Sequence, residues 1–558
     1  MISQGAAIRI HRISSWLALL TTAALTLPAG ATPAEELQAK LDARFKGDRS
    51  GACVVAALID RDKVSRARTC AQPRSVGAPR YDSVFEIGSV TKTMTAYLVA
   101  DLIHQGKWSL DDALAKHLPP GTELPRQGDR QILVRDVLTH TSGLPPLPPG
   151  FNPKNPGDPY ADLSEQALLA ALGKVQLNRP IGSQFEYSNF AMMAMSSAVA
   201  RSYGSDYESA LARRLFVPLE MNGAYVERPR SKRPVASGHL PSGRPTADWH
   251  AANNLAGVGM VRATLDDMVV YAQAELGWGH ADGTVLANLQ LTQHPLSSRS
   301  GMNWMLFNLK GHDLVVHEGT TGGFSSLVML EPKAQRAVVI LADASLGDVG
   351  GLSGLGSALL DLDMRPLRPR LASTPSAELL TAIQGDYELS GMSARIWLDG
   401  NRLKAQAVGQ PPFELKYDSE GDFYPEGFSA LLTPQWLDGK VDRAVWRQNG
   451  GVAEVVRRSA RTAPTAIDPR WKDFAGDYEL MPQFHLRVFE ESGVLKVQGS
   501  GQPALAAYGT GTDTLEIKAV GAFIEFKRDA AGDVRSVVFK QGGQVLEGKR
   551  TAQTSLTN

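Results

Sequence analysis

The chain has 558 residues, which is too long for one hydrophobic core and predicts about three to four domains. Its composition is that of an ordinary globular protein, with 43% hydrophobic and 21% charged residues. Lysine plus arginine and aspartate plus glutamate both number 58, and no basic tract is present. A nucleic acid or an anionic membrane is therefore not expected as the main partner.

The N-terminus has the pattern of an export signal. A basic segment at 9–12 precedes an apolar run at 16–27, and the small residues Ala-Gly-Ala follow at 29–31. This pattern predicts a signal peptide over 1–31 that is cleaved near Ala31–Thr32. The apolar run is short for a membrane span, although an uncleaved anchor stays open. We expect a periplasmic or secreted protein with no transmembrane segment after cleavage.

The two cysteines are placed to form a disulfide. Cys53 and Cys70 flank two runs of strand-like residues that are separated by a polar turn. A hairpin folded about Arg61 and Asp62 brings the two cysteines opposite each other. A cross-strand disulfide is plausible in an oxidising compartment, and two buried thiols are the alternative. A two-cysteine metal site lacks further ligands.

The most informative stretch is residues 86–94, where Ser89 stands at the start of an apolar helical run and Lys92 follows one turn later. Residues three apart share a helix face, so both side chains can point into one pocket. The Ser89 backbone N–H would lie among the unpaired donors of the helix N-terminus. Nucleophile, base and half of an oxyanion hole would then come from a single turn. Ser-x-x-Lys alone is weak evidence, because roughly one is expected by chance in a chain of this length.

A second group of polar residues follows in the chain. A helix predicted over 131–138 leads into Leu-Thr-His-Thr-Ser-Gly-Leu-Pro at 138–145 and a loop rich in proline and glycine that can line a cleft. After a helix predicted over 161–175, Tyr187 and Asn189 stand two apart. Directly behind them comes a helix predicted over 190–202. A loop there would present a phenol and an amide together; a core tyrosine with a helix-capping asparagine is the alternative.

The pattern then changes from helix to strand. Helices are predicted over 204–227 and 264–276, after which apolar residues alternate with period two. The predicted strands form a meander at 304–309, 313–317, 325–331 and 336–342. A helical region between two strand regions predicts a sheet built from both ends of the domain. The fold class is therefore α+β, with an all-helical insertion.

The C-terminal third is β-rich and repeats itself. The segment Gly-Asp-Tyr-Glu-Leu at 385–389 returns at 476–480, and the Leu-Lys segment at 403 returns at 495. The period of about 90 residues is too long for a solenoid unit. Two tandem antiparallel β-barrels fit better, over 376–460 and 468–552.

Taken together, these motifs resemble the serine beta-lactamase and penicillin-binding-protein superfamily, on its class C side. Ser89 with Lys92, Tyr187 with Asn189, the segment at 138–145 and the bend at 317–324 occur in family order over about residues 45–345. The resemblance implies that 32–368 is a beta-lactamase-like serine hydrolase domain. It implies an antiparallel sheet flanked by helices, an all-helical subdomain, and no metal or other cofactor.

The resemblance also implies roles for the site residues. Ser89 would be the acylated nucleophile, and Lys92 would shuttle its proton. Tyr187 would act as general base and as acid at the leaving group. Asn189 would hydrogen-bond Lys92 and the substrate amide. The role of the lysine in Ser-x-x-Lys enzymes is disputed, and the sequence does not settle it.

The bend at 317–324 is expected to contribute to the oxyanion hole, and it departs from the class C pattern at one point. His317-Glu318-Gly319 replaces Lys-Thr-Gly, with His317 and Gly319 expected to line the substrate site. The backbone N–H groups of Ser89 and Thr320 would form the oxyanion hole. Histidine is mostly neutral above pH about 6.5, and Glu318 is expected to add a negative charge. Strong selection of an anionic beta-lactam is therefore disfavoured.

The expected function is an exported serine hydrolase that works through an acyl-enzyme on Ser89. His-x-Gly resembles the D,D-peptidase, D-aminopeptidase and esterase branches, and paired barrels resemble bacterial D-aminopeptidases. A peptidase or amidase acting on small or D-amino-acid peptides is favoured. The alternatives are an esterase of the same fold, a class C-type beta-lactamase and a non-catalytic penicillin sensor. Gly-x-Ser-x-Gly and His-Glu-x-x-His are absent, which excludes an α/β-hydrolase and a zincin. The oligomeric state is not indicated.

Overall fold

The computed structural model describes residues 31–551 apart from short gaps. The predicted signal peptide lies outside the described residues except for Ala31. The gaps are at 75–76, 364–366, 390–391, 438–439, 449–450, 459–472, 482–483, 492–493, 501–503, 518–521 and 542–543.

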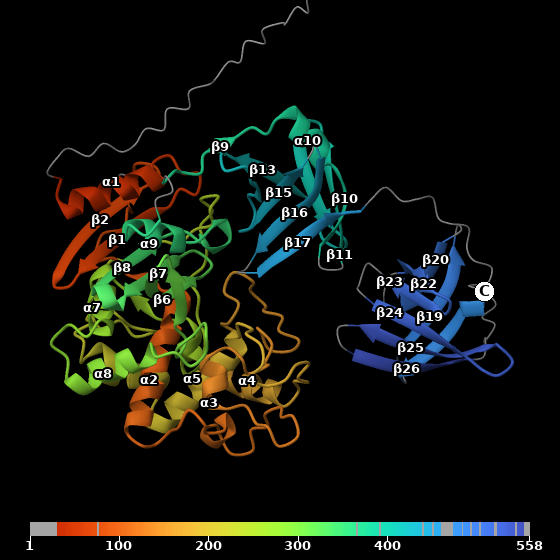
Figure 1. Cartoon of the computed structure of the whole chain (residues 1–558), viewed down its shortest axis with the longest axis horizontal. Coiled ribbons are helices and arrows are strands. Elements are labelled where there is room, and N and C mark those ends of the chain that lie inside the picture. The colour runs from red at the N-terminus through yellow and green to blue at the C-terminus, as the bar shows by residue number, and fades with distance from the viewer. Residues whose placement is uncertain are drawn as a thin grey trace, which may run out of the picture.

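The N-terminal domain is built on one six-stranded antiparallel sheet with the order β2-β1-β8-β7-β6-β5 (Figure 1). Its first two strands come from the N-terminal end of the domain and the other four from the C-terminal end, which confirms the predicted plan. The strands are β1 (Cys53–Asp60), β2 (Lys63–Cys70), β5 (Met305–Leu309), β6 (His312–Thr320), β7 (Ser325–Glu331) and β8 (Arg336–Ala342).

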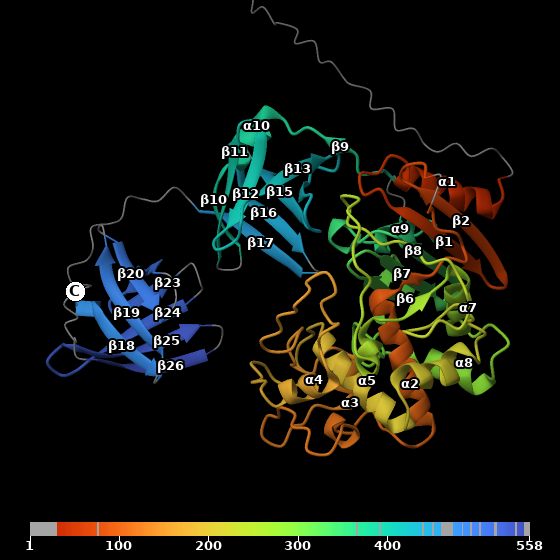
Figure 2. The same cartoon turned by 180° about the vertical axis from the view of Figure 1, so that it is seen from behind.

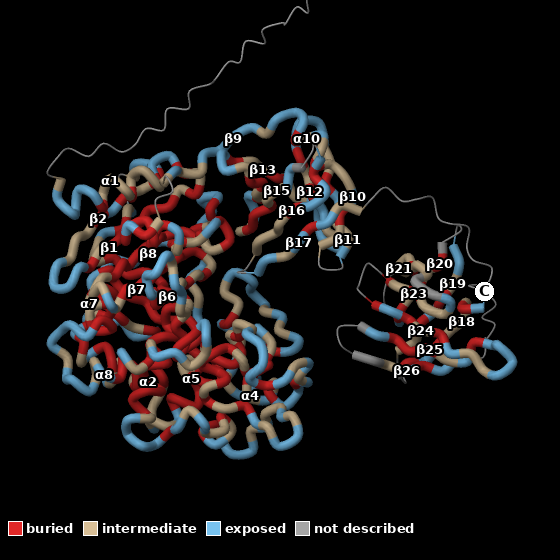
Figure 3. Tube along the Cα trace, in the orientation of Figure 1, coloured by how far each residue is buried: buried red, intermediate tan, exposed pale blue. Residues whose placement is uncertain are grey.

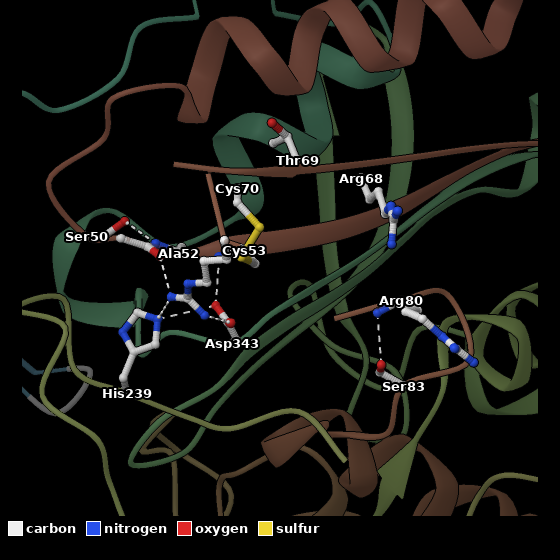
Figure 4. Close-up of a disulfide and its surroundings, with 12 residues drawn as sticks. Ser50, Ala52, Cys53, Arg68, Thr69, Cys70, Arg80, Ser83, His239 and Asp343 are labelled. Carbon is white, nitrogen blue, oxygen red and sulfur yellow. Dashed lines mark hydrogen bonds and ion pairs between the residues drawn. A yellow bond between two sulfur atoms is a disulfide. The ribbon is translucent and has the colours of Figure 1, made fainter. Parts of the chain in front are cut away.

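The β1–β2 hairpin carries the predicted disulfide. Cys53 lies directly opposite Cys70 in the antiparallel register, and their sulfur atoms are bonded (Figure 4). The Cys53 backbone N–H also donates to Asp343, which follows β8 and forms an ion pair with Arg74 at 2.8 Å. The disulfide thus links the two strands of the hairpin, and the hydrogen bond from Cys53 links the hairpin to the segment after β8.

Helices cover both faces of this sheet. Alternate residues of β1 point to opposite faces, so they pack into two different cores. Val55, Ala57 and Ile59 join the larger core, while Val54 and Ala56 join the smaller one. Buried residues run through this sheet and through the helices beside it (Figure 3). The larger core contains α2 (Thr91–His104), α5 (Asn189–Tyr203), α7 (Leu265–Glu275) and α8 (Gly283–Thr292). The smaller core contains α1 (Pro33–Phe45) and α9 (Ser353–Leu359).

The helical insertion is shorter and less regular than the sequence predicts. It contains α3 (Val134–Leu138), α4 (Glu165–Leu172), α5 and α6 (Tyr207–Leu211). The helix predicted over 204–227 is wrong beyond Phe216, because α6 continues only as one π-helical turn. Pro218 then follows, and Glu220 adopts a left-handed conformation with φ of 58°, which stops the helix. No described helix is long and apolar enough to cross a bilayer.

The C-terminal region forms two antiparallel barrels, which confirms the predicted fold class. In the first, β12 pairs with β13 and closes the ring; in the second, the described strands β21 and β22 lie at the two ends of the strand order. The first contains β10 (Gly385–Leu389), β11 (Met392–Asp399), β12 (Arg402–Ala407), β13 (Phe413–Asp418), β14 (Phe423–Pro425), β15 (Leu431–Leu437), β16 (Lys440–Gln448) and β17 (Gly451–Arg457), with β9 (Ala372–Ser373) and α10 (Ala377–Ile383). The second contains β18 (Gly476–Met481), β19 (Phe484–Glu491), β20 (Val494–Gly499), β21 (Leu505–Ala506), β22 (Tyr508–Gly511), β23 (Thr514–Ile517), β24 (Ala522–Arg528), β25 (Val534–Gln541) and β26 (Gln544–Arg550).

The sequence repeat places the same contact in both barrels. Tyr387 in β10 donates its phenol proton to the Ile383 carbonyl, and Tyr478 in β18 donates to the Phe474 carbonyl four residues back. Both tyrosines are fully buried. The repeated segment is therefore the first strand of each barrel, locked by one tyrosine.

The first barrel packs against the N-terminal domain (Figure 2). Leu431 of β15 belongs to the same apolar cluster as the helices α1 and α9 of that domain. Next to it, Asp418 of β13 accepts from Arg49 at 2.9 Å and from Arg370 at 2.9 Å. The core of the second barrel contains only its own residues within the described part of the chain.

Candidate active site

Ser89 lies in a 3₁₀ turn (Gly88–Val90) that leads directly into α2. Lys92 follows in the first turn of α2 and is fully buried. Its Nζ donates to Ser89 Oγ at 2.9 Å and to the Val258 carbonyl at 2.5 Å. The structure therefore brings the serine and lysine of the motif into direct contact, as their spacing predicts.

The environment of Lys92 makes it a base near neutral pH. Burial disfavours the charged ammonium and lowers the pKa of Lys92 from its ordinary value to about 7. A substantial fraction of neutral amine is then present at pH 7. That amine is in position to take the proton of the Ser89 hydroxyl.

Tyr187 contacts both members of this pair. Its ring centroid lies 4.9 Å from Lys92 Nζ, and the Ser89 hydroxyl is close enough to affect the pKa of its phenol. Burial raises the pKa of Tyr187 well above its ordinary value, and the nearby Ser89 hydroxyl opposes this only in part. The phenol therefore keeps its proton. This favours Tyr187 as the acid at the leaving group and Lys92 as the base.

Two glycines bring the predicted oxyanion donors together. Gly319 packs so tightly that a Cβ atom there would lie 2.1 Å from the Ile87 carbonyl oxygen and 2.9 Å from the Ser89 nitrogen. Gly88, with φ of 49°, would place a Cβ atom 2.8 Å from the Thr320 nitrogen. Only glycine fits at either position, and the close packing sets the backbone of β6 against the Ser89 turn. The Ser89 and Thr320 backbone nitrogens are thus neighbours, as an oxyanion hole requires.

Asn189 is in the site, but one of its predicted contacts is absent. Its Nδ2 donates to the hydroxyl of Tyr160 at 3.1 Å, and its Oδ1 is buried without a partner. The predicted hydrogen bond from Lys92 is therefore wrong in this structure, since Lys92 donates to Ser89 and Val258 instead. The free Oδ1 can accept an N–H from a substrate, which would offset the cost of leaving it unpaired.

His317 is neutral and presents an acceptor. Its Nδ1–H donates to the Glu318 carbonyl at 2.9 Å, so Nε2 carries the lone pair. That Nε2 is buried without a partner. Burial, with a smaller effect from the Lys92 charge, lowers the pKa of His317 to about 3. The position that carries a permanent cation in class C enzymes is uncharged here.

Glu318 lies on the other face of the sheet. Its carboxylate accepts from the Leu352 backbone N–H at 2.5 Å and from the Ser353 hydroxyl at 2.7 Å. The expectation that Glu318 adds a negative charge to the site is therefore wrong. Consecutive residues of β6 point to opposite faces, so His317 enters the site while Glu318 meets the start of α9.

Three contributors to the site were not predicted. Val258 offers only a carbonyl, which no side-chain motif reveals. Tyr160, the partner of Asn189, stands at the end of the loop that was expected to line a cleft. His140 lies in the segment at 138–145, which was noted as a motif without a role, and its ring packs 4.3 Å from the Tyr187 ring.

A serine activated by a buried lysine beside a protonated tyrosine defines a serine hydrolase. Comparison with known proteins agrees with this class. The family model described as Beta-lactamase matches residues 37–352, which is more than half of the chain. The chain belongs to this family.

Relatives of known name support the same class. D-alanyl-D-alanine-carboxypeptidase/endopeptidase AmpH of Escherichia coli K12 is 27% identical over 267 residues, or 46% of this chain and 68% of AmpH. Penicillin-binding protein 4 of Amycolatopsis lactamdurans is 26% identical over 290 residues, or 48% of this chain and 73% of that protein.

Solved structures extend the likeness in fold. The octameric penicillin-binding protein homologue from Pyrococcus abyssi has a TM-score of 0.50 and 17% identity, over 83% of this chain and 97% of that one. A class C beta-lactamase has a TM-score of 0.50 and 18% identity, over 60% of this chain and 98% of its own.

Proposed function

We propose that the protein is an exported peptidase or amidase that acylates Ser89 with small peptides, including peptides of D-amino acids. The contact between a buried Lys92 and the Ser89 hydroxyl carries the proposal. The similarity to AmpH, a D-alanyl-D-alanine-carboxypeptidase/endopeptidase, supports peptide substrates of this kind.

The proposed reaction begins with acylation. Neutral Lys92 takes the Ser89 proton while Oγ attacks the substrate carbonyl, and the Ser89 and Thr320 N–H groups bind the oxygen that becomes negative. Tyr187 donates its proton to the leaving nitrogen as the C–N bond breaks, and the proton held by Lys92 restores the phenol. A water molecule then adds to the acyl carbonyl and gives its proton to neutral Lys92, which passes it to Ser89 Oγ as the ester bond breaks. The acid is released and Ser89 regains its proton.

The site's hydrogen-bonding groups favour an amide over a carboxylate-anchored beta-lactam. His317 Nε2 and Asn189 Oδ1 are buried acceptors without partners. Neutral N–H donors satisfy such atoms, whereas a carboxylate at His317 would meet no cation. An ester of the same acyl group has one N–H fewer than the amide and would satisfy fewer of these acceptors. An esterase is therefore the second candidate.

A panel of substrates tests the proposal. Purified protein is assayed with a D-alanyl-D-alanine peptide, a D-aminoacyl p-nitroanilide, a p-nitrophenyl ester and a chromogenic cephalosporin. Hydrolysis of either amide above the beta-lactam, in wild type only and not in Ser89→Ala, supports the proposal. Turnover of the ester alone would establish the esterase, and turnover of the cephalosporin alone would establish a beta-lactamase.

Export forms part of the same proposal. The signal pattern over 1–31 and a disulfide between Cys53 and Cys70 both suit an oxidising compartment. Expression of the full chain in a Gram-negative host, followed by fractionation, should recover protein that begins near Thr32 outside the cytoplasm. Full-length protein confined to the cytoplasm would contradict export without affecting the chemistry.

A further inference from the structure

His140 has a backbone conformation that a histidine rarely adopts. Its φ is 55°, in the left-handed region, and its side chain is buried. It lies at the end of α3, where its N–H donates to the Val137 carbonyl at 3.1 Å. A strained, buried histidine that the mechanism does not use calls for an explanation.

The contacts of the His140 carbonyl and ring lead to the segment that carries Tyr187. Its carbonyl accepts from the Glu186 N–H at 2.7 Å, and its Nδ1 accepts from the Ser188 N–H at 3.2 Å. Between these two bonds, its ring packs on the Tyr187 ring, with 4.3 Å between centroids and 31° between planes. His140 therefore contacts both chain neighbours of Tyr187 and the Tyr187 ring itself.

These contacts require the neutral ring in a single tautomer. Because Nδ1 accepts a hydrogen bond from the Ser188 backbone N–H, the ring proton must lie on Nε2, which is buried and has no partner among the described residues. Burial, with smaller effects from the charges of Lys92 and His317, lowers the pKa of His140 well below its ordinary value. The ring keeps this form throughout the working range of the enzyme.

Tyr187 needs external support because it lies outside regular structure. No helix or strand contains residues 183–187, and α5 begins only at Asn189. Ser188 fixes the far end by accepting from Ala191 and by donating to the Pro145 carbonyl at 2.6 Å. The backbone N–H groups of Glu186 and Ser188, on either side of Tyr187, both donate to His140.

We propose that His140 is a positioning residue that holds the Tyr187 phenol where it protonates the leaving group. The inference rests on the proposed function, because it concerns the acid of the same acylation step. The left-handed backbone turns the His140 carbonyl and Nδ1 toward the segment 186–188. The two hydrogen bonds then set the height of Tyr187 above Ser89, and the ring contact sets its tilt.

Two variants separate the parts of this role. His140→Gly keeps the left-handed backbone and its carbonyl but removes the ring and the Nδ1 acceptor. His140→Asn keeps an acceptor at the same place, and asparagine tolerates the left-handed region. His117→Asn is the matched control, because His117 is also buried and stacks on Trp108, with 4.0 Å between centroids, outside the site.

The readout is kcat/KM on an amide and on an ester with the same acyl group. A p-nitroanilide needs a proton on its leaving nitrogen, whereas p-nitrophenolate leaves without one. His140→Gly should lose about 100-fold on the anilide, the usual cost of a small misplacement of a reacting group, and less than about threefold on the ester. His140→Asn should recover about tenfold of the anilide loss, and His117→Asn should change neither substrate.

A double-mutant cycle completes the test. In a Tyr187→Phe background, His140→Gly should cost less than about twofold further on the anilide, because the group that it positions is gone. Equal losses on both substrates in folded His140→Gly, or additive losses in the double variant, would overturn the proposal. If His140→Gly fails to fold, an anilide loss in His140→Asn as large as its ester loss would overturn it as well. An inactive wild type would instead refute the proposed function.

Discussion

At the scale of single residues, the chemistry depends on how little water reaches Lys92. Its ammonium is fully buried and has one hydroxyl and one carbonyl as hydrogen-bond partners. Neither partner offsets the lost hydration of a charge, so the pKa of Lys92 falls to about 7. Glu318, which could have offset it, lies on the opposite face of the sheet.

This pKa predicts the pH dependence of acylation. Only the neutral amine accepts the Ser89 proton, so activity should be lost as pH falls below the pKa and gained as pH rises through it. We expect kcat/KM to rise across about pH 6–8 with an inflection near 7. Stopped-flow acylation by a fluorophosphonate, which needs no leaving-group proton, measures this directly. A rate that rises only above about pH 9 would mean that Lys92 stays charged.

His317 predicts a gain of function. Lysine at this position would supply the cation that the site lacks, and a partly buried ion pair with a carboxylate is worth roughly tenfold or more in affinity. His317→Lys should therefore acylate faster at low penicillin concentrations, whereas His317→Gln, a neutral control, should not. An unchanged second-order rate in His317→Lys would show that another residue holds the carboxylate.

The sequence predicted those parts of the site whose residues lie close together in the chain. Ser89 with Lys92, and Tyr187 with Asn189, are close in the chain, so local geometry brings each pair together. Val258 could not be predicted, because a carbonyl has no identity in the sequence. The orientation of Glu318 followed from strand alternation and was predictable in principle.

At the scale of elements, the β1–β2 hairpin combines pairing, burial and a covalent link. Its register places Cys53 on Cys70, with 17 residues of separation along the chain. A loop of this length restricts the unfolded chain by about 3 kcal/mol. The edge strand β2 has only β1 beside it, so the disulfide compensates for a missing neighbour.

Removing the disulfide should therefore cost stability rather than activity. The double variant Cys53→Ala/Cys70→Ala should lower the free energy of unfolding by about 3 kcal/mol, measured by urea denaturation. Activity at 25 °C should stay within about twofold, since neither cysteine contacts the site residues. Reduction of wild type should reproduce the loss, and a stability loss below about 1 kcal/mol would show that the hairpin does not need the bond.

The elements that the sequence predicted best are the ones with strong periodicity. The helices α5 and α7 and the strands β6 to β8 lie within a few residues of their predicted bounds, and α2 begins where the apolar run after Ser89 predicts a helix. The helix α1 was missed, although Thr32 and Glu35 form a capping box and Pro33 occupies the first turn. Its position beside the expected cleavage site concealed it. The predicted helix beyond Phe216 failed because proline and a left-handed residue outweigh apolar pattern.

At the scale of the whole molecule, the first barrel is a structural partner of the catalytic domain. Asp418 is completely buried and accepts from Arg49 and Arg370, and the Arg49 guanidinium lies 3.5 Å from the centroid of the Tyr424 ring. Leu431 continues the apolar cluster of α1 and α9. These contacts could not be predicted from the sequence, because Asp418 and Leu431 belong to no motif. The two barrels themselves could, because the repeat is written in the sequence.

Breaking this ion cluster should loosen the domain contact. Asp418→Ala would leave the largely buried Arg49 guanidinium without a carboxylate and Arg370 with Asp422 alone, which costs about 3–5 kcal/mol. Thermal unfolding should occur at a lower temperature, with the catalytic domain and first barrel affected together. Asp442→Ala, which removes an exposed carboxylate from the same barrel, is the control and should change little. An Asp418→Ala protein as stable as the control would show that the two domains are energetically independent.

The central claim is that Ser89 becomes acylated, and intact-protein mass spectrometry tests it most directly. Wild type and Ser89→Ala are incubated with a fluorophosphonate and with a penicillin, and the adduct is located by peptide mapping. We predict stoichiometric labelling of Ser89 by the fluorophosphonate, slower labelling by the penicillin, and no label on Ser89→Ala. Well-folded wild type that gains no mass from either reagent, or a label that persists in Ser89→Ala, would contradict the account.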